Sequence, residues 1–477
     1  MKGNVMKQVG NMWGNIHKYW SNKSGAIALM FGMMLPILVG VAGVSLDYSR
    51  AYLVKQRLAQ ALDAAALAAA ASSTDSTVIE QKVLDFFAAN YPPGELGITF
   101  TPSVVIVGDE VQVSGTAQYD TLFLGVLGIE VIDVEASTTV IREVQGIEVV
   151  LVMDNTGSMN TNNNIGALRD AASNFVYIMY GIDPDDGAAA DPSTLDALAT
   201  RDTDYIKIGL VPYSSSVNVG PYGLGVDKAG DSYGTAFVNN PQGLSYTTAS
   251  NNNNWMGCVL AHDYPDDTTD HTGPWNMYRY CRDSSDAPYC DLGSYWSGGV
   301  QHFYVNKKPN HYCPKTPLTP LVTSPTELKG AIDTMTANGY TYGNYGMVWG
   351  YRVISPEAPF EEGVAWSNQY WRKAVVMMTD GVNTMHNRYS AYGPTQDHSI
   401  TPSDLNDRFA DVCNNLKDDG VIVYTVTFYS GVDENTKDFY RECATSEDYY
   451  HDAPAQEDLI DVFETISREL SNLHIKG

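Results

Sequence analysis

An uncharged apolar segment near the N-terminus constrains this chain most strongly. Residues 25–46 read GAIALMFGMMLPILVGVAGVSL, which is 22 residues without a charge. As a helix that rises about 1.5 Å per residue, this segment would span roughly 33 Å, about one hydrocarbon core of a bilayer. A cleaved secretory signal normally has a shorter apolar core of about 7–15 residues, and a buried helix of a soluble protein is the other alternative. We therefore predict an uncleaved transmembrane helix over residues 25–46.

The basic residues around this segment give only a weak indication of its orientation. Residues 1–24 contain four lysines and no acid, and the stretch after the segment carries a similar number of basic residues. The positive-inside rule slightly favours a cytoplasmic location for the N-terminal residues 1–24. The cysteines favour the same orientation, because an exported C-terminal body would allow them to form disulfides.

The charge of the chain argues against one class of partner. Its 477 residues include 29 Lys and Arg against 56 Asp and Glu, which gives a formal net charge of −27. Binding of nucleic acid needs a basic face, so we expect no nucleic-acid partner. A surplus of acids favours sites for cations or for basic surfaces. The length predicts two or three domains.

The pattern of residues changes between the apolar segment and residue 145. Residues 47–74 are rich in alanine and contain neither Gly nor Pro, so we predict a helix that continues from the membrane, either as a stalk or packed on a similar helix through its small side chains. A short amphipathic helix follows, and the next segments alternate apolar and polar residues around a turn at Gly108–Asp109. We therefore predict a small α+β module over residues 75–145.

Strands alternate with helices over residues 146–475. Apolar runs such as IEVVLVMD, YIKIGLVPYS and VIVYTVTFYS are typical of buried parallel strands, and amphipathic helices separate them. This alternation predicts an α/β fold with a doubly wound, mostly parallel sheet. Residues 214–316 break the alternation. They are rich in Gly, Asn, Tyr and Ser, and we predict that they form an insertion.

Six cysteines follow the apolar segment, and no two of them form a C-x-x-C pair, so their spacing gives little support for zinc. Outside the cytoplasm, disulfides are the default expectation. We predict two disulfides within the insertion, with all three pairings open, among Cys258, Cys281, Cys290 and Cys313. We also predict a bridge between Cys413, in a helix, and Cys443, in the loop before the last helix.

Polar residues follow the ends of two predicted strands. The first strand ends at Asp154 and leads directly to Thr156 and Ser158, and a later strand ends at Asp380. A glycine-containing loop before a helix presents Thr341. Ligands of open α/β sheets bind at the carboxyl ends of the strands. Two carboxylates and three hydroxyls suit a hard cation such as Mg²⁺ and leave room for an outside ligand.

This set of residues resembles the metal-ion-dependent adhesion site of von Willebrand factor type A domains. In that family the first strand ends in D-x-S/T-x-S, a later loop supplies a threonine, and a T-D-G turn supplies an aspartate. The resemblance covers roughly residues 147–470 and implies metal ligands, with Mg²⁺, Mn²⁺ or Ca²⁺ as the ion, at Asp154, Thr156, Ser158, Thr341 and Asp380. The insertion accounts for the long separation between the first motif and the loop threonine, for which Thr334 and Thr336 are nearby alternatives.

The N-terminus resembles a narrower family. Residues 25–70, which lead into a body with VMDNTGSM, are similar to TadG-like proteins of the tight-adherence (Flp) pilus system, as are TPLTPL, WGYRVISPEAPF and MMTDGVNT. The resemblance implies a bacterial component of pilus assembly or surface adherence. Such a protein would cross the inner membrane once, with its C-terminal body in the periplasm or exposed outside the cytoplasm. A processed pilin has a Glu five residues after its cleavage site, and the corresponding residue here is Met30.

Three functional hypotheses follow from these patterns. The first is a membrane-anchored adhesion or assembly protein, in which a carboxylate of a protein partner completes the shell of the bound metal. The second is a pseudopilin-like structural subunit, whose A-type domain caps a filament and whose hydroxyl-rich turn only caps a helix. The third, a metal-dependent hydrolase, needs a base that no motif supplies, and Ser158 lacks the context of a nucleophile. We therefore expect no enzymatic activity. Histidines in the insertion lack the close ligand pairs of a zinc site.

Overall fold

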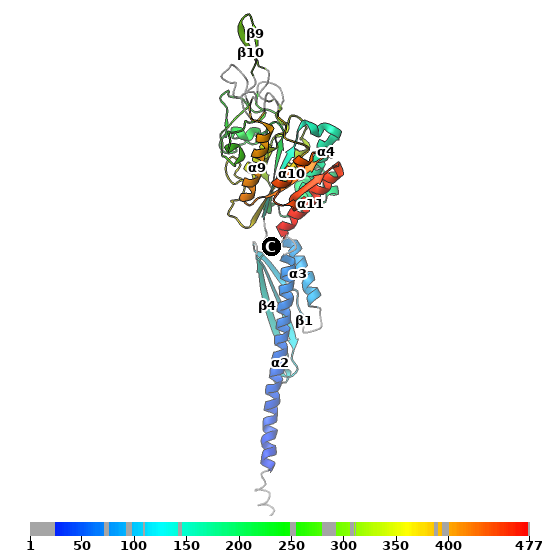
Figure 1. Ribbon diagram of the computed structural model, residues 1–477. Helices are drawn as coiled ribbons and strands as arrows, with labels where there is room; N and C mark the ends of the chain where they lie inside the picture. Colours follow the sequence, from blue (N-terminus) through cyan, green and yellow to red (C-terminus); the bar gives the residue numbers. More distant parts are fainter. Residues whose placement is uncertain are drawn as a thin grey trace, which may run out of the picture. The chain divides into compact units, whose positions relative to one another are not determined.

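The chain forms two compact units, which divide between Arg142 and Glu143. The computed structural model describes residues 24–70, 76–91, 98–107, 110–141, 146–248, 254–278, 292–305, 310, 312–385, 390–393 and 400–475. Figure 1 shows the helices and strands of these residues. Each unit has a hydrophobic core of its own.

The described part of the N-terminal unit combines helices with a four-stranded antiparallel sheet. Its elements are α2 (Ser24–Ala70), α3 (Ser76–Asn90), β1 (Ile98–Thr99), β2 (Ser103–Val107), β3 (Glu110–Asp120), the 3-10 helix η1 (Leu124–Leu127) and β4 (Val131–Ile141). Strand β3 pairs with β1, with β2 and, over its whole length, with β4. The predicted turn at Gly108–Asp109 lies outside the described residues, and the strands on either side of it pair as antiparallel neighbours.

Helix α2 is one continuous helix (Figure 1). Its two halves differ in which side chains they expose. Its segment Ile27–Ala69 is long and apolar enough to cross a membrane, by length and composition, and no other described helix is. Large apolar side chains are exposed from Ile27 to Leu46, whereas the later residues are buried at every third or fourth position. Their buried face packs on β3, β4 and α3. The residues predicted to form a stalk therefore contribute one side of the hydrophobic core of the α+β module.

The C-terminal unit contains a six-stranded sheet with helices on both faces. The described strands of this unit, six of which form the large sheet, are β5 (Gly146–Asp154), β6 (Ile206–Tyr213), β7 (Val238–Asn239), β8 (Trp275–Asn276), β9 (Leu292–Ser297), β10 (Val300–Val305), β11 (Thr319–Val322), β12 (Trp371–Thr379), β13 (Ile422–Phe428) and β14 (Tyr450–Ala453). Its α-helices are α4 (Asn164–Met179), α5 (Pro184–Ala189), α6 (Leu195–Leu198), α7 (Pro325–Asp333), α8 (Gly343–Ile354), α9 (Pro402–Asp418), α10 (Glu434–Cys443) and α11 (Gln456–Ile475). Its 3-10 helices are η2 (Gly157–Asn163), η3 (Pro192–Thr194), η4 (Thr203–Tyr205), η5 (Gly220–Leu224), η6 (Asp266–Thr268) and η8 (Glu447–Tyr449).

The large sheet has the strand order β11-β6-β5-β12-β13-β14. Every neighbouring pair is parallel except β11 with β6. One core cluster includes the buried faces of α4, α7 and α11, and the other includes those of α8 and α9. Strands β5 and β12 occupy the middle of the sheet, and nearly all their residues are buried. The predicted α/β fold with a doubly wound, mostly parallel sheet is confirmed.

Part of the predicted insertion belongs to the main core: buried residues between Val217 and Tyr278 are members of one core cluster, whereas residues 296–300 are exposed. Trp255 and Trp275 are fully buried in the cluster beneath α8. The guanidinium of Arg352 on α8 lies 5.0 Å from the ring centroid of Trp275. It also donates a hydrogen bond of 3.0 Å to the backbone carbonyl of Asp266. These contacts fasten the insertion to the α8 face of the sheet.

Two disulfides lie within the described residues, Cys258–Cys313 and Cys413–Cys443. The first closes 55 residues of the insertion and selects one of the open pairings for these two cysteines. Cys281 and Cys290 lie outside the described residues. The predicted position of Cys443 was wrong in one respect, since this residue ends helix α10 and does not lie in a loop. The bridge therefore joins α9 to α10.

Truncation of Leu58 tests the packing of α2 on the sheet. Leu58 is fully buried, so Leu58→Ala should lower the stability of the N-terminal unit by about 2–5 kcal/mol. The measurement is hydrogen–deuterium exchange of the β3 amides in the full chain in detergent. Leu67→Ala is the matched control, because Leu67 lies on the same helix and is 58% exposed. Equal exchange rates in the two variants would contradict the packing described here.

Candidate metal centre

The two predicted carboxylates meet because their strands are neighbours in the sheet. Strand β5 ends at Asp154, and Asp380 directly follows the end of β12. The parallel pairing of these strands runs from Gly146 with Trp371 to Val152 with Met377. Both strands therefore end at the same edge of the sheet. This is the carboxyl edge, where open α/β sheets bind ligands.

Asp154 is fully buried and accepts hydrogen bonds on both oxygens. Its Oδ1 accepts from the backbone N–H of Thr156 at 2.8 Å. Its Oδ2 accepts from the hydroxyls of Tyr213 at 3.1 Å and Thr379 at 3.0 Å. These bonds hold the carboxylate in one orientation and occupy both lone pairs of Oδ2, so a lone pair of Oδ1 remains for another ligand.

The hydroxyls of the first motif connect the two strand ends. The oxygens Thr156 Oγ1 and Ser158 Oγ lie 2.9 Å apart. Ser158 Oγ donates a hydrogen bond of 2.7 Å to Oδ1 of Asp380, which is 222 residues away in the chain. Four of the five predicted ligands are therefore joined in one hydrogen-bonded group.

Thr341 lies in a loop that backbone hydrogen bonds fasten to both strand ends. The N–H of Gly157 donates to the carbonyl of Gly339 at 3.0 Å, and the N–H of Thr384 donates to the carbonyl of Thr341 at 2.8 Å. Thr341 is buried. Within the described residues, no hydrogen bond joins its hydroxyl to the other four predicted ligands. The loop thus lies next to the other four predicted ligands, and its Thr341 hydroxyl makes no described hydrogen bond to them.

The sharp turn before Thr341 requires glycine. Gly339 has a φ of +94°, and a Cβ there would lie 2.9 Å from Ser215 Oγ and 3.0 Å from Ser214 Oγ. Ser215 Oγ also accepts from the N–H of Tyr340 at 2.8 Å. These two serines follow β6 and position the loop, a role that sequence reasoning missed.

The two alternative threonines have other surroundings. The hydroxyl of Thr334 lies 3.0 Å from that of Thr316 and donates to the carbonyl of Ala331 at 2.8 Å. Thr336 is exposed. Neither has a described contact with the motifs at the strand ends, so Thr341 is the better candidate of the three.

The buried carboxylates form an unfavourable pair of like charges. Burial raises the pKa of Asp154, despite the hydrogen bonds that it accepts. Burial and the charge of Asp154 raise the pKa of Asp380 to about 7. Neither carboxylate has an ion pair with Lys, Arg or His within the described residues. A divalent cation between them would supply the missing positive charge, and the oxygen donors around it fit such an ion.

Sequence reasoning missed two further residues that contact Asp154. Tyr213 ends β6, and Thr379 ends β12. Burial and the nearby charge of Asp154 raise the pKa of Tyr213 well above its usual range, so this phenol stays a hydrogen-bond donor. The sequence did offer one indication that Tyr213 lies near Asp154, because Tyr213 ends a predicted parallel strand. Among the described residues there is no group of three or more His, Cys, Asp and Glu side chains that could hold a metal. The candidate centre is therefore one of carboxylates and hydroxyls.

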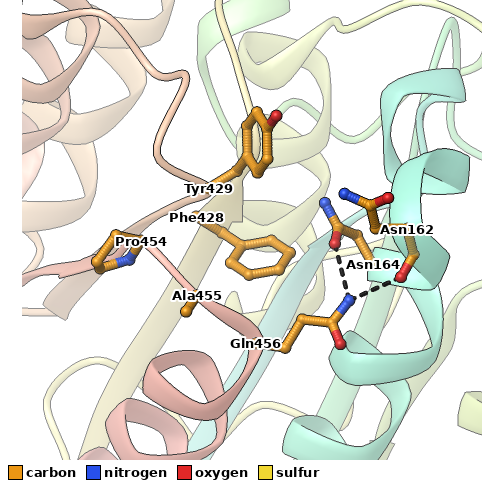
Figure 2. A pocket seen from close by; sticks show the side chains of 7 residues that line it. All are labelled: Asn162, Asn164, Phe428, Tyr429, Pro454, Ala455 and Gln456. Carbon is orange, nitrogen blue, oxygen red and sulfur yellow. Dashed lines mark hydrogen bonds between the residues drawn. The ribbon is translucent and has the colours of Figure 1, made fainter.

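A pocket of about 310 Å³ adjoins the segment that carries the hydroxyls (Figure 2). It lies between the start of α4, the ends of β13 and β14, and the start of α11. The amide of Gln456 donates to the backbone carbonyl of Asn162 at 2.8 Å and to Oδ1 of Asn164 at 3.0 Å. Tyr429, which lines the pocket, has a φ of +87°. The Gln456 bonds fasten the end of the segment that begins at Gly157.

Residues 25–72 match a protein-family model described as "Putative Flp pilus-assembly TadE/G-like". A search of curated proteins gave no match.

Several solved structures resemble this chain weakly. The pilus adhesin SpaC from Lactobacillus rhamnosus GG, in its open conformation, has a TM-score of 0.36 at 12% identity, over 79% of this chain and 35% of that chain. The vWF domain of the type V pili tip protein Mfa5 from Porphyromonas gingivalis has a TM-score of 0.35 at 11% identity, over 70% of this chain and 97% of that one.

A third similar structure is proximal thread matrix protein 1 from the mussel byssus, with a zinc-occupied MIDAS motif. Its TM-score is 0.32 at 13% identity, over 69% of this chain and 46% of that chain. The matches to SpaC and to the byssus protein span between a third and a half of those chains. The α/β fold of this chain is defined by the order and pairing of its own strands. The N-terminal segment of this chain, residues 25–72, is similar in sequence to the TadE/G-like family of putative Flp pilus-assembly proteins.

Proposed function

We propose that this chain is a membrane-anchored component of tight-adherence (Flp) pilus assembly or surface adhesion. Its C-terminal unit binds a protein partner through a divalent cation at the carboxyl edge of the sheet. The observation that carries this proposal is the pair of buried carboxylates, linked by hydrogen bonds through Thr156 and Ser158 and without an ion pair among the described residues. The match over residues 25–72 supports the association with pilus assembly.

The donor set supports Mg²⁺ as the ion, with Mn²⁺ or Ca²⁺ as possible substitutes. Mg²⁺ prefers about six oxygen ligands, of which one or two are carboxylates. The residues that would hold it are Asp154, Thr156, Ser158, Thr341 and Asp380. Five protein oxygens leave a place for an outside ligand. An acidic residue of the partner suits that place, because a carboxylate is a hard, charged oxygen donor. This function is binding, and we propose no catalytic role.

The first half of α2 supports the proposed location. Its exposed apolar side chains suit a single span of the bacterial inner membrane. The disulfides Cys258–Cys313 and Cys413–Cys443 suit a body outside the reducing cytoplasm. We therefore propose that the C-terminal unit lies in the periplasm or beyond it.

One observation favours a second function. The Ser158 hydroxyl donates a hydrogen bond to the Asp380 carboxylate, and this contact requires no bound ion. A pseudopilin-like subunit, whose A-type domain caps a filament and binds no metal, would use this group only to brace the sheet. Metal binding distinguishes the two functions.

Calorimetric titration of the full chain in detergent with Mg²⁺ and Mn²⁺ tests the proposed site. The parent should show saturable binding, and Asp154→Ala combined with Asp380→Ala should abolish it. The matched control is Asp170→Ala combined with Asp418→Ala, which removes two exposed acids from the same unit and should leave binding unchanged. Equal binding by all three proteins would assign the signal to surface acids, and a parent that binds no ion would favour the pseudopilin-like function.

The role of the loop is tested by comparison of two threonines. Thr341→Ala should weaken Mg²⁺ binding about tenfold, because the ion loses one oxygen ligand from a site with few alternatives. Thr336→Ala should leave the affinity unchanged, since this residue is exposed in the same segment. The measurement is the same calorimetric titration. A larger loss in Thr336→Ala than in Thr341→Ala would contradict the assignment.

The carboxylate pair predicts a pH dependence of the metal-free protein. The pKa of Asp380 is about 7 in the folded chain and 3.8 when unperturbed, so the fold binds this proton more tightly. The contribution of Asp380 to stability is therefore full below about pH 4 and is lost as the pH rises to about 7. Asp380→Asn should be more stable than the parent at pH 8 and similar to it below about pH 4, by thermal unfolding in chelator. A stability difference that does not change with pH would contradict the raised pKa.

A further inference from the structure

The connection between β3 and β4 carries an exposed cluster of large apolar side chains. This apolar loop is defined as residues 122–129, and it includes the 3-10 helix η1. Val126 is 89% exposed and Leu127 is 68% exposed. The other exposed members are Leu122, Phe123 and Ile129. Exposed apolar side chains gathered in one short loop indicate an interaction surface.

The loop is a closed and anchored structure. The hydroxyl of Thr121 donates to the carbonyl of Ile129 at 2.6 Å, and the N–H of Thr121 donates to the carbonyl of Glu130 at 2.9 Å. These bonds close the base of the loop. The exposure of the apolar side chains is therefore a property of a defined conformation.

Asp47 fastens this loop to helix α2 at the end of its apolar half. Its buried carboxylate accepts hydrogen bonds from three successive backbone N–H groups, those of Leu122, Phe123 and Leu124, at 2.9, 2.8 and 2.7 Å. Asp47 is the first charged residue after the uncharged segment 25–46. The loop is thus held at the level where the helix changes from apolar to polar.

Phe123 reaches from this level back along the apolar half of the helix. A Cβ added at Gly43 would lie 2.6 Å from Cβ of Phe123, so glycine is required for this contact. Gly43 precedes Asp47 by four residues, which is about 6 Å along a helix. On the other side, Arg50 follows Asp47 by about one turn and is exposed, as suits a residue near lipid headgroups.

We propose that the apolar loop, residues 122–129, inserts into the headgroup and upper acyl region of the same bilayer that α2 crosses. The lipid surface is the one occupant that suits it, because the loop continues the apolar surface of α2 at the depth where that surface ends. The residues beside the loop, Asp120 and Glu130, are acidic, so the attraction is apolar and does not depend on anionic lipids. This second contact would fix the depth and tilt of the anchor. The inference rests on the proposed membrane anchoring.

Depth-dependent quenching tests this proposal in the full chain. A small environment-sensitive fluorescent amino acid is placed at Leu127 by suppression of a stop codon, and the protein is reconstituted in phosphatidylcholine vesicles. Some of the lipids carry a nitroxide at a shallow acyl position. The matched control is the same probe at Ile141, which is 67% exposed. Ile141 and Val131 are the two ends of β4, about 34 Å apart in an 11-residue strand. A third probe at Leu38 reports on the membrane span itself.

We expect the shallow nitroxide to quench the probe at Leu127 at least threefold more than the probe at Ile141. A nitroxide near the bilayer centre should quench the probe at Leu38 most strongly. If Leu38 is quenched and Leu127 behaves like Ile141, the helix spans the membrane but the loop does not insert, and this inference is overturned. If Leu38 is not quenched, the membrane anchoring fails and the inference fails with it. A blue-shifted but unquenched probe at Leu127 would show that protein, such as a second copy of the chain, covers the loop, and would also overturn it.

Discussion

The parallel pairing of β5 with β12 is the contact on which the candidate site depends. It joins segments more than 200 residues apart in the chain and ends both strands at one edge of the sheet. The same pairing brings two carboxylates into a buried place where they repel one another. Hydroxyls and backbone N–H groups hold these carboxylates in place without neutralising them. Without a ligand at this edge the two carboxylates destabilise one another, and the proposed divalent cation would make their proximity favourable.

The rest of the C-terminal unit positions the loop that carries Thr341. The insertion lies between β6 and that loop in the chain, yet its buried residues between Val217 and Tyr278 belong to the core cluster that includes α8. Arg352 contacts this part through Trp275 and Asp266, and the Cys258–Cys313 bridge closes it. Ser214 and Ser215, at the start of the insertion, contact the turn at Gly339. The long separation in sequence between the motifs is thus compatible with a short separation in space.

Local patterns were sufficient to predict the layers of the fold and the ends of its central strands. The runs that end at Asp154 and Asp380 are nearly continuous in apolar residues, so the sequence indicated both that they are buried strands and where they end. Helix α10 was missed, although Thr436, Tyr440 and Cys443 repeat with a helical period and are buried, because the stretch is short and polar. The alanines of α2 indicated a helix but not its partner, since small side chains pack on many surfaces. The surroundings of Tyr213 and the pairing of Cys258 depend on tertiary contacts, which no local pattern encodes.

The most direct test of the central claim is a crystal structure of the full chain grown with Mn²⁺, with data collected at the manganese absorption edge. If the cation binds as proposed, an anomalous peak lies at the carboxyl edge of the sheet, about 2.1 Å from oxygens of Asp154 and Ser158, with Asp380 and Thr341 around it. The hydrogen bond between Ser158 and Asp380 would then be broken, because both side chains would bind the ion. An ordered site without a peak, with that hydrogen bond intact, would rule out the proposed metal site and show that these residues only stabilise the edge of the sheet.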